Sequence, residues 1–496
     1  MVLVTGAGPV GLTMAMSLKR LGVDLRIIDK NAERTDKSKA LVIWPRTLEL
    51  LDIQGCAEAF VAAGLKGAGA RMLAGGKELV HVRFDTARSA FRYALLIPQS
   101  ETERVLEEEL AKLGVRVERQ VDLHSFAQDD DGVSVVLDGP SGRTENARVD
   151  WLLGCDGAHS TIRMGLGAQF EGSTMRSEWM LGDVAIEGPL PPDELTICWT
   201  EHGVLALFPI IGGRVRVIAD MGENMADAAP PPTLEELQAV IDQRGPAGLA
   251  ARDPVWLSRF RINERKVTDY RDGRVFLAGD AAHIHSPAGG QGMNTGMQDA
   301  FNLAWKLALV VHGRAQAELL DSYSPERSAI GAQVLRNAGR LTEIGITRNP
   351  LLQELRNVAV GTLGQFAMVQ QRIVDQLTEV DLHYPDSPLT QSLPGAARRP
   401  AAGARAVDVA LAESDGGHAR LHEVLATGRF AVLSVGAPRV ALPDTLRALA
   451  TSAVAAENDH YDTGHVYLVR PDAYVSSSTG ASDAGAIVTA LTQLRA

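Results

Sequence analysis

The first thirty residues contain two short, continuous apolar runs. Between the two runs, the apolar residues recur at the spacing of a helix. Residues 2–4 are an apolar run that enters a glycine-rich turn, and the spacing after the turn predicts a helix over about residues 10–21. Residues 23–28 are largely apolar again and predict a second strand. Asp29 follows this strand, eighteen residues after Gly11. The pattern is typical of the strand, turn, helix and strand that begin a parallel sheet.

Two later junctions repeat the step from a buried strand into an acidic turn. The first ends at Cys155-Asp156-Gly157 and the second at Gly279-Asp280. The second junction continues through the glycine-rich loop 286–294 into a long helix over about residues 296–311. Such a loop presents several backbone N–H groups in front of a helix, which favours a negatively charged ligand. A plain turn is the alternative for the first junction.

The middle of the chain has a different pattern. Residues 178–222 are rich in strand-like runs with few helix signals, and they predict a mainly antiparallel sheet that would roof a substrate cavity. Trp199, Leu207, Phe208 and Met221 are candidate apolar wall residues of this cavity. Ordinary core positions explain each of them at least equally well.

The last third of the chain begins with a helical pattern over residues 316–382, followed by a stretch at 385–404 that is typical of a linker. Strand patterns at 430–435 and 466–472, with a closing helix at 484–494, predict a third domain of about a hundred residues.

The composition is that of an ordinary globular protein. The chain has 496 residues, of which 45% are hydrophobic and 22% charged, so two or three domains with a large core are expected. The net charge of −12 argues against nucleic acid or an anionic membrane as a partner. Cys56, Cys155 and Cys198 are few and widely spaced, which fits buried thiols in a reducing compartment. Residues 2–18 are uncharged but too short and too glycine-broken for a signal peptide or a membrane span, so we expect a cytoplasmic protein.

The first turn suits a dinucleotide pyrophosphate. Gly6 permits the tight turn, Gly8 lets the backbone approach the phosphates, and Gly11 lets helix and strand pack closely. Asp29 would accept hydrogen bonds from ribose hydroxyls and would repel a 2′-phosphate. Arg46 would contact an anion near the pyrophosphate, and an exposed surface arginine is the alternative. A glycine turn without a ligand would explain a bare motif, and this stretch does not decide between NAD and FAD.

The three motifs together resemble those of the class A flavoprotein aromatic hydroxylases, the group that includes para-hydroxybenzoate hydroxylase, phenol hydroxylase and the hydroxylases of aromatic polyketides. The matching stretches are Gly6 to Gly11, Cys155-Asp156-Gly157 with Arg163, and Gly279-Asp280 to Asn294. The resemblance covers residues 1 to about 395 and implies FAD as the cofactor. The residues that it places on FAD are Gly6, Gly8, Pro9, Val10, Gly11, Asp29, Lys30, Lys39, Arg46, Gln99, Asp156, Asp280, Pro287, Gly290, Gly292, Met293 and Asn294.

The resemblance also implies where these residues act. Asp29 would hold the adenosine ribose, Arg46 and Gln99 would follow the pyrophosphate and the ribityl chain, and Asp280 would hold a ribityl hydroxyl. Asp156 belongs to a motif that the family associates with both FAD and the nicotinamide cofactor. Lys39 stands where the family usually has arginine, so the bidentate fork of that contact is lost.

The implied reaction uses NADPH or NADH as a transient reductant and O2, with a C4a-hydroperoxyflavin that hydroxylates a small aromatic substrate, phenolic or polyketide. Pro287, Gly290 and Gly292 would present their backbone to the flavin as the catalytic side of the site. Only one GxGxxG motif is present, which agrees with a reductant that binds transiently. A flavin-dependent dehydrogenase and a non-catalytic flavin-binding protein on the same scaffold are the alternatives. A halogenase is disfavoured, because no two tryptophans lie two residues apart.

The fold class expected from these patterns and from the resemblance is α/β. A discontinuous Rossmann-like FAD-binding domain comprises residues 1–175 and 265–345, and an inserted antiparallel-sheet substrate domain comprises residues 176–264. Residues 346–394 form a helical segment and linker, and residues 395–496 resemble a thioredoxin-like C-terminal domain. That last domain contains no cysteine, which excludes a redox role and leaves packing or association. For the protein as a whole, a homodimer is a possible state.

Overall fold

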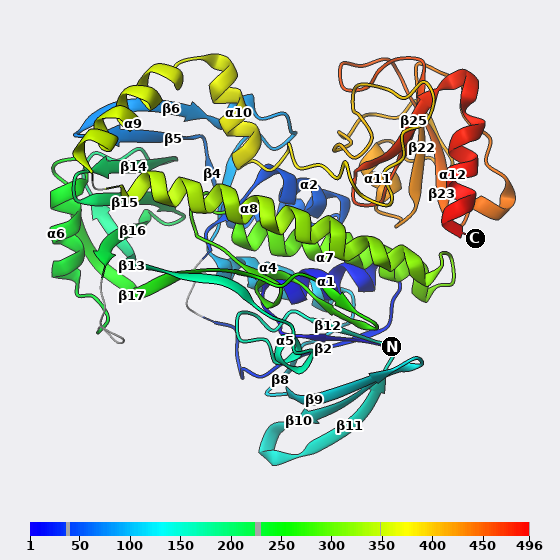
Figure 1. Cartoon of the computed structure of the whole chain (residues 1–496), viewed down its shortest axis with the longest axis horizontal. Helices are drawn as coiled ribbons and strands as arrows, with labels where there is room; N and C mark the ends of the chain where they lie inside the picture. Colours follow the sequence, from blue (N-terminus) through cyan, green and yellow to red (C-terminus); the bar gives the residue numbers. More distant parts are fainter. Residues whose placement is uncertain (36–39, 224–229, 348, 496) are drawn as a thin grey trace.

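The computed structural model describes residues 1–35, 40–223, 230–347 and 349–495 (Figure 1). The expected mixed α/β fold is confirmed, with twelve α-helices and five sheets in the described ranges. No helix in these ranges combines the length and the hydrophobicity needed to cross a lipid bilayer.

The first large sheet is built around the N-terminal strand. Its order is β18-β19-β12-β1-β2-β8, and all neighbours except β18 and β19 run parallel. The strands are β18 (Arg271–Asp272), β19 (Val275–Leu277), β12 (Trp151–Gly154), β1 (Val2–Thr5), β2 (Leu25–Asp29) and β8 (Glu118–Arg119). The continuous apolar run of β1 is explained by burial on both faces of a parallel sheet. Helix α1 (Pro9–Arg20) packs between α4 (Gln99–Lys112) and α7 (Gly292–Val311) (Figure 1).

The second large sheet has the order β20-β17-β13-β16-β15-β14-β5-β6. Its strands are β20 (His283–Ile284), β17 (Ala250–Lys266), β13 (Glu171–Glu187), β16 (Arg214–Glu223), β15 (Gly203–Ile210), β14 (Glu194–Thr200), β5 (Gly69–Ala74) and β6 (Lys77–Arg83). Residues 69–83 were expected in the nucleotide-binding domain. They belong instead to this sheet, because β5 pairs in parallel with β14. Helix α6 (Leu234–Arg244), which begins with a capping box between Thr233 and Glu236, packs on one face of the sheet.

Two three-stranded sheets and six further helices complete the first 394 residues. The small sheets contain β3 (Val42–Ile43), β7 (Ala94–Leu96) and β4 (Leu65–Gly67), and β11 (Thr144–Val149), β10 (Gly132–Asp138) and β9 (Asp122–Asp129). The helices are α2 (Pro45–Ile53), α3 (Ala57–Ala63), α5 (Thr161–Gly165), α8 (Tyr323–Ile346), α9 (Pro350–Leu363) and α10 (Ala367–Leu377). Helices α9 and α10 lie over β6, at the outer edge of the second large sheet (Figure 1).

The C-terminal domain is a five-stranded sheet with the order β21-β23-β22-β24-β25. Its elements are β21 (Glu413–Ser414), α11 (Leu421–Leu425), β22 (Phe430–Val435), β23 (Ala450–Ala455), β24 (His465–Val469), β25 (Val475–Gly480) and α12 (Gly485–Arg495). Strand β22 runs parallel to β23 and antiparallel to β24, so the central strand joins both kinds of pairing.

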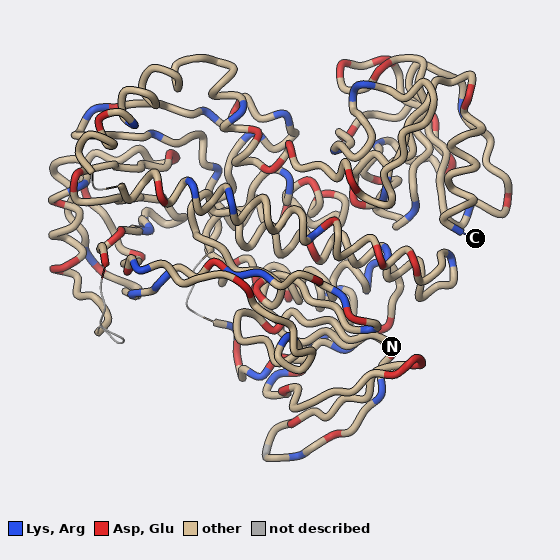
Figure 2. Tube along the Cα trace, viewed as in Figure 1, with Lys and Arg blue, Asp and Glu red and all other residues tan. Residues whose placement is uncertain are grey.

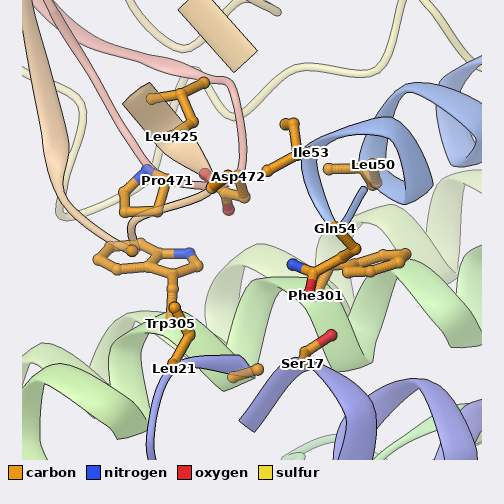
Figure 3. A pocket seen from close by; sticks show the side chains of 13 residues that line it. Ser17, Leu21, Leu50, Ile53, Gln54, Phe301, Trp305, Leu425, Pro471 and Asp472 are labelled. Carbon is orange, nitrogen blue, oxygen red and sulfur yellow. The ribbon is translucent and has the colours of Figure 1, made fainter. Parts of the chain in front are cut away.

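The C-terminal domain docks against helices α1, α2 and α7 around a small cavity of about 20 Å³. Figure 3 shows that side chains from all of these parts line it, among them Ser17, Ile53, Gln54, Phe301, Trp305, Leu425, Pro471 and Asp472. The Ser17 hydroxyl, the Gln54 carbonyl oxygen and the Trp305 indole N–H are buried here without partners among the described residues. A polar cavity of this size has room for about one water molecule.

Candidate functional site

Four strands of the first large sheet end in one line. The register pairs Thr5 of β1 with Ile28 of β2 and with Gly154 of β12, and Gly154 with Leu277 of β19. Asp29 is the last residue of β2, and the residues that follow the other three strand ends are Gly6, Cys155-Asp156 and Ala278-Gly279-Asp280. The three sequence motifs and Asp29 therefore meet at the carboxyl edge of a parallel sheet, where α/β proteins bind their ligands.

The glycines of the first turn differ in what surrounds them. A Cβ on Gly6, whose φ is +89°, would lie 2.3 Å from the Cys155 carbonyl oxygen, and a Cβ on Gly11 would lie 1.8 Å from the Gly6 carbonyl oxygen. A Cβ on Gly8 would meet no atom within 4 Å. Gly6 and Gly11 are thus required by the protein's own packing, whereas Gly8 borders open space at the N-terminus of α1. This space fits a pyrophosphate, which a helix N-terminus attracts.

Asp156 offers an unused acceptor at the same edge. Its Oδ2 accepts a hydrogen bond from the Ile162 N–H at 3.2 Å, whereas its Oδ1 is buried without a partner among the described residues. Burial raises the pKa of this carboxyl group. Asp280 follows a run of buried residues but is itself exposed. Two carboxyl groups beside the turn suit a ligand that carries hydroxyl groups, such as the ribityl chain of FAD.

Asp29 is close to fully buried and accepts a hydrogen bond from the glycine-rich turn. Its Oδ2 accepts from the Ala7 N–H at 2.7 Å and its Oδ1 accepts from the Asn31 N–H at 2.8 Å. The Asn31 side-chain amide also donates to Oδ1, at 2.9 Å, so three of the roughly four acceptor positions of the carboxylate are used and about one remains for a ribose hydroxyl. Lys30 is exposed beside it.

The first and third motifs are in direct contact. Pro9 begins α1, and Val10 packs between the Gly279 turn and α7. A Cβ on either Gly279 or Gly296 would lie 2.7 Å from Val10 Cγ2, so only glycine fits at both positions.

The glycine-rich loop leads into α7, which begins at Gly292, four residues earlier than the pattern indicated. Gly289 and Gly290 have φ values of +85° and +63°, which favour glycine. The buried Asn294 side chain accepts from the Trp44 N–H at 2.9 Å and donates to the Val42 carbonyl at 2.8 Å. Asn294 therefore ties β3 to the start of α7. Pro287 is exposed, and Gly292 and Met293 are half-buried beside it.

Gln99 begins α4 and pairs with Ala40. The Gln99 N–H donates to the Ala40 carbonyl at 3.0 Å, and the Gln99 side chain accepts from the Ala40 N–H at 3.4 Å and donates to Glu103 at 2.9 Å. Lys39 lies outside the described residues, so the structure gives no account of it.

Arg46 is a correction to the expected pyrophosphate contact. Its guanidinium group is fully buried and donates to Glu49 at 3.1 Å and to the Asp472 carbonyl at 2.6 Å, and it lies 4.6 Å from the ring centre of Tyr474. Arg46 therefore points into the C-terminal domain, because its partners are acceptors from that domain and from its own helix.

The expected substrate wall is corrected in part, because alternate residues of a strand face opposite sides of a sheet. Leu207 and Met221 belong to the apolar cluster under α6, on the face away from the nucleotide turn. Phe208 packs on the other face, against the cluster that contains Val42 and Trp44. Trp199 also lies on that other face, where it is covered by Arg356 at 4.3 Å.

A row of residues on the same face as Phe208 was not among those expected from the sequence. Arg216 pairs with Phe208 across β15 and β16, and Asp183 pairs with Arg216 and with Trp256 across β16, β13 and β17. Arg216 is fully buried and donates two hydrogen bonds of 2.7 Å to the Asp183 carboxylate. The Trp256 indole N–H also donates to Asp183, at 3.1 Å. Arg216 also donates to the Ala40 carbonyl at 3.1 Å, which connects this row to Gln99. Charged residues inside otherwise apolar strand patterns were the signal that would have identified them.

Two histidines lie behind the glycine-rich loop. His283 Nε2 lies 2.7 Å from Asp299 Oδ2, and the His285 ring stacks on His283 with 5.5 Å between ring centres. Burial lowers the pKa of His285 to about 3, so this ring is neutral at physiological pH.

Glu379 is a fully buried carboxyl group beside α7. Gln298 donates to its Oε2 at 2.6 Å, and its Oε1 has no partner among the described residues. Burial raises its pKa from an ordinary value near 4.5 to about 8. The unfolded chain therefore loses this proton at lower pH than the folded chain does, and the stability falls as the pH rises from about 4.5 to about 8.

We predict that Glu379→Gln removes this pH dependence, because the amide is neutral and of similar shape. Between pH 6 and pH 7.5 the native chain should lose about 2 kcal/mol relative to the variant. Urea unfolding at both pH values measures the difference. Parallel pH profiles for the two proteins would contradict the assignment of a proton to Glu379.

The sheet edge, the open space at Gly8 and the unpaired Asp156 acceptor define a nucleotide-binding α/β protein. Residues 1–338 match the family model described as FAD binding domain. The chain is 39% identical over 398 residues to 6-methylpretetramide 4-monooxygenase of Streptomyces rimosus, covering 78% of this chain and 71% of that protein. It is 35% identical over 437 residues to rifampicin monooxygenase of Streptomyces venezuelae, covering 87% and 86%.

The solved structure of OxyS anhydrotetracycline hydroxylase from Streptomyces rimosus superposes with a TM-score of 0.79 at 31% identity, covering 99% of this chain and 98% of that chain. The chain therefore belongs to the FAD-binding-domain family of flavin-dependent aromatic monooxygenases, and it is an enzyme of that class.

Proposed function

We propose that this enzyme uses NAD(P)H and O2 to hydroxylate a phenolic or polyketide ring with FAD as its cofactor. The observation that carries the proposal is the meeting of Gly8, Asp156 and Asp280 at one sheet edge, with α1 and α7 beginning beside it. When bound, FAD would supply the redox chemistry, taking up a hydride from the nicotinamide and passing one atom of O2 to the ring.

The chain's own residues would hold and orient this cofactor. The N–H groups of the first turn of α1 would face the pyrophosphate, and Asp29 would accept from the adenosine ribose. Asp156 and Asp280 would accept from hydroxyl groups farther along the cofactor. The backbone of Pro287, Gly290 and Gly292 would border the flavin ring, with Met293 and Asn294 beside it, and the N–H groups at the start of α7 would stabilise negative charge that develops on the ring.

The substrate would lie between this site and the face of the second large sheet that carries Phe208. The Arg216–Asp183–Trp256 row supplies a buried cation, a carboxylate and an indole on that face. Such a wall suits a flat aromatic molecule, because the partly exposed rings of Phe208 and Trp256 would contact its faces, while the buried Arg216–Asp183 pair would hold the Trp256 indole in position. The tetracycline-type and rifampicin relatives support a polycyclic substrate.

The test is the oxidation of NADPH or NADH by the purified, FAD-loaded protein across a panel of phenols and polycyclic polyketides. The proposal expects that one substrate class stimulates NAD(P)H oxidation together with O2 uptake, and that the product gains one oxygen atom by mass spectrometry. Oxidation of the substrate without the gain of an oxygen atom would instead indicate a dehydrogenase. A yellow protein with no turnover on any member of the panel would support a binding role.

We predict that Asp280→Ala weakens FAD binding about 100-fold, so that the protein is purified largely without cofactor. The reason is the loss of a charged acceptor for a ribityl hydroxyl. Flavin fluorescence during titration of the apoprotein measures the affinity. Asp272→Ala, an exposed carboxylate eight residues earlier, is the matched control and should bind FAD normally. Equal affinities for the two variants would overturn the placement of Asp280.

A further inference from the structure

The exposed large apolar side chains of this protein are concentrated in one region. Of the fourteen such side chains in the described ranges, nine lie between residues 341 and 368, at the end of α8, along α9 and at the start of α10. Leu351 is 78% exposed, Leu355 66% and Met368 85%. We call this region the α9 surface. Figure 1 shows α9 at the periphery of the molecule, far from the C-terminal domain.

Helix α9 turns a mixed polar and apolar face toward the protein, where Gln353 is its one buried residue, and an apolar stripe outward. On the side that faces the protein, Val360 packs against the apolar cluster that contains Val80 and Val82 of β6. One turn later, a Cβ on Gly364 would lie 2.9 Å from Val80. On its outer face Leu351, Leu355 and Val358 follow one another at the spacing of a single helical stripe. An amphipathic surface helix normally turns its apolar stripe toward the core, whereas this stripe is exposed and has no covering partner among the described residues.

The size of this surface matches one half of a specific protein interface. At roughly 100 Å² for each of its nine large exposed side chains, the α9 surface presents on the order of 900 Å². The largest apolar patch on a typical monomer is only ~300–600 Å². Each partner of a standard interface buries ~800 Å², which is similar to the area of the α9 surface.

The charge of the region favours a second copy of the same chain. The protein carries a net charge of −12, so two copies repel one another over most of their surface. Residues 341–371 contain two acidic and two basic residues and are therefore neutral. Figure 2 shows the arc of α9 and α10 largely without charged residues. Contact between two such neutral surfaces avoids the repulsion.

A membrane is a poorer occupant. Amphipathic helices that bind membranes carry several lysines or arginines beside their apolar face. Helix α9 contains one arginine, Arg356, which donates to the Ile344 carbonyl at 3.0 Å and lies over Trp199. This arginine is directed into the protein and is not available to lipid headgroups.

We propose that the α9 surface is a homodimer interface, in which the α9 helices of two copies pack across a two-fold axis. A self-complementary apolar stripe is the simplest basis for such an isologous contact. The proposal is independent of the reaction that the enzyme catalyses.

The test is sedimentation velocity and light scattering of the full-length, FAD-loaded protein at about 10 µM, a concentration at which a dimer with a Kd of about 1 µM or lower is well populated. The wild type is expected to be a dimer, and Leu351→Glu combined with Leu355→Glu is expected to be a monomer with unchanged circular dichroism. Val255→Glu, at a position 62% exposed on β17, is the matched control and should remain a dimer.

A monomeric wild type overturns the proposal, and a dimeric double-glutamate variant overturns the location of the interface. If the glutamates prevent folding, Leu351→Ser combined with Met368→Ser provides the same test with smaller changes. Co-sedimentation of a monomeric wild type with anionic phosphatidylserine vesicles would replace the dimer with a membrane contact.

Discussion

Gly8→Leu is expected to abolish FAD binding while leaving the protein folded. A side chain at Gly8 would enter the space at the N-terminus of α1, where a Cβ meets no protein atom within 4 Å. The cofactor pyrophosphate would have to occupy the same space, because the second glycine of the motif allows the backbone to approach the phosphates. The affinity should fall on the order of 100-fold or more, which corresponds to about 2.7 kcal/mol. Titration of the apoprotein with FAD measures this loss.

Gly11→Ala is the informative companion to this variant. Its Cβ would lie 1.8 Å from the Gly6 carbonyl oxygen, so the turn and α1 cannot keep their contact. This variant should be unstable by more than about 3 kcal/mol even without FAD, whereas apo Gly8→Leu should melt with the apo wild type. If Gly8→Leu retained FAD, or if both variants lost only stability, the assignment of this space to the cofactor would be wrong.

Arg470→Leu is expected to produce the largest loss of stability outside the first turn. Arg470 is 1% exposed and donates to Glu326 of α8 at 2.7 and 2.9 Å and to Asp472 at 3.0 Å. Lys306 of α7 also lies 2.7 Å from Glu326. Removal of one member of a buried charge cluster leaves the others uncompensated and typically costs 3–5 kcal/mol. Chemical denaturation monitored by circular dichroism gives the free energy of unfolding.

Arg439→Leu is the control for Arg470, since it makes the same change in the same domain. Arg439 is 41% exposed in its ion pair with Asp415, and exposed pairs contribute about 0–1 kcal/mol. Similar small losses for both variants would show that the Arg470 cluster contributes little to stability.

The parts of the fold that were predictable from sequence are those with local causes. The strand at Val2–Thr5, the turn and helix α1 follow from a contiguous apolar run and three glycines, and the structure places them as expected. The pairing of β5 with β14 has no such local signal, because the two strands are more than a hundred residues apart and pair in parallel. The resemblance to the family rests on the order of three motifs, which a sequence shows directly.

The parts of the site that are formed by the backbone were predictable from the sequence. The parts that depend on the direction of a side chain were less predictable. Leu207 and Phe208 are adjacent and both apolar, yet only the register of β15 determines that Phe208 faces the nucleotide side. Arg46 has the composition of an anion contact, but its acceptor at Asp472 lies 426 residues later in the chain. Asp183 and Arg216 are 33 residues apart and become a pair only through the pairing of β13 with β16.

The seam between the C-terminal domain and the rest of the chain has a consequence for evolution and engineering. Glu49 of α2 lies 2.6 Å from Arg405, and Glu326 of α8 lies 2.7 Å from Arg470. In both buried ion pairs the C-terminal domain contributes the arginine and the rest of the chain contributes the glutamate. Chimeras that exchange the C-terminal domain between relatives would succeed only when both halves of each pair are inherited together. Although the C-terminal domain contains no cysteine, its arginines match the glutamates of the rest of its own chain. It is therefore not an interchangeable module.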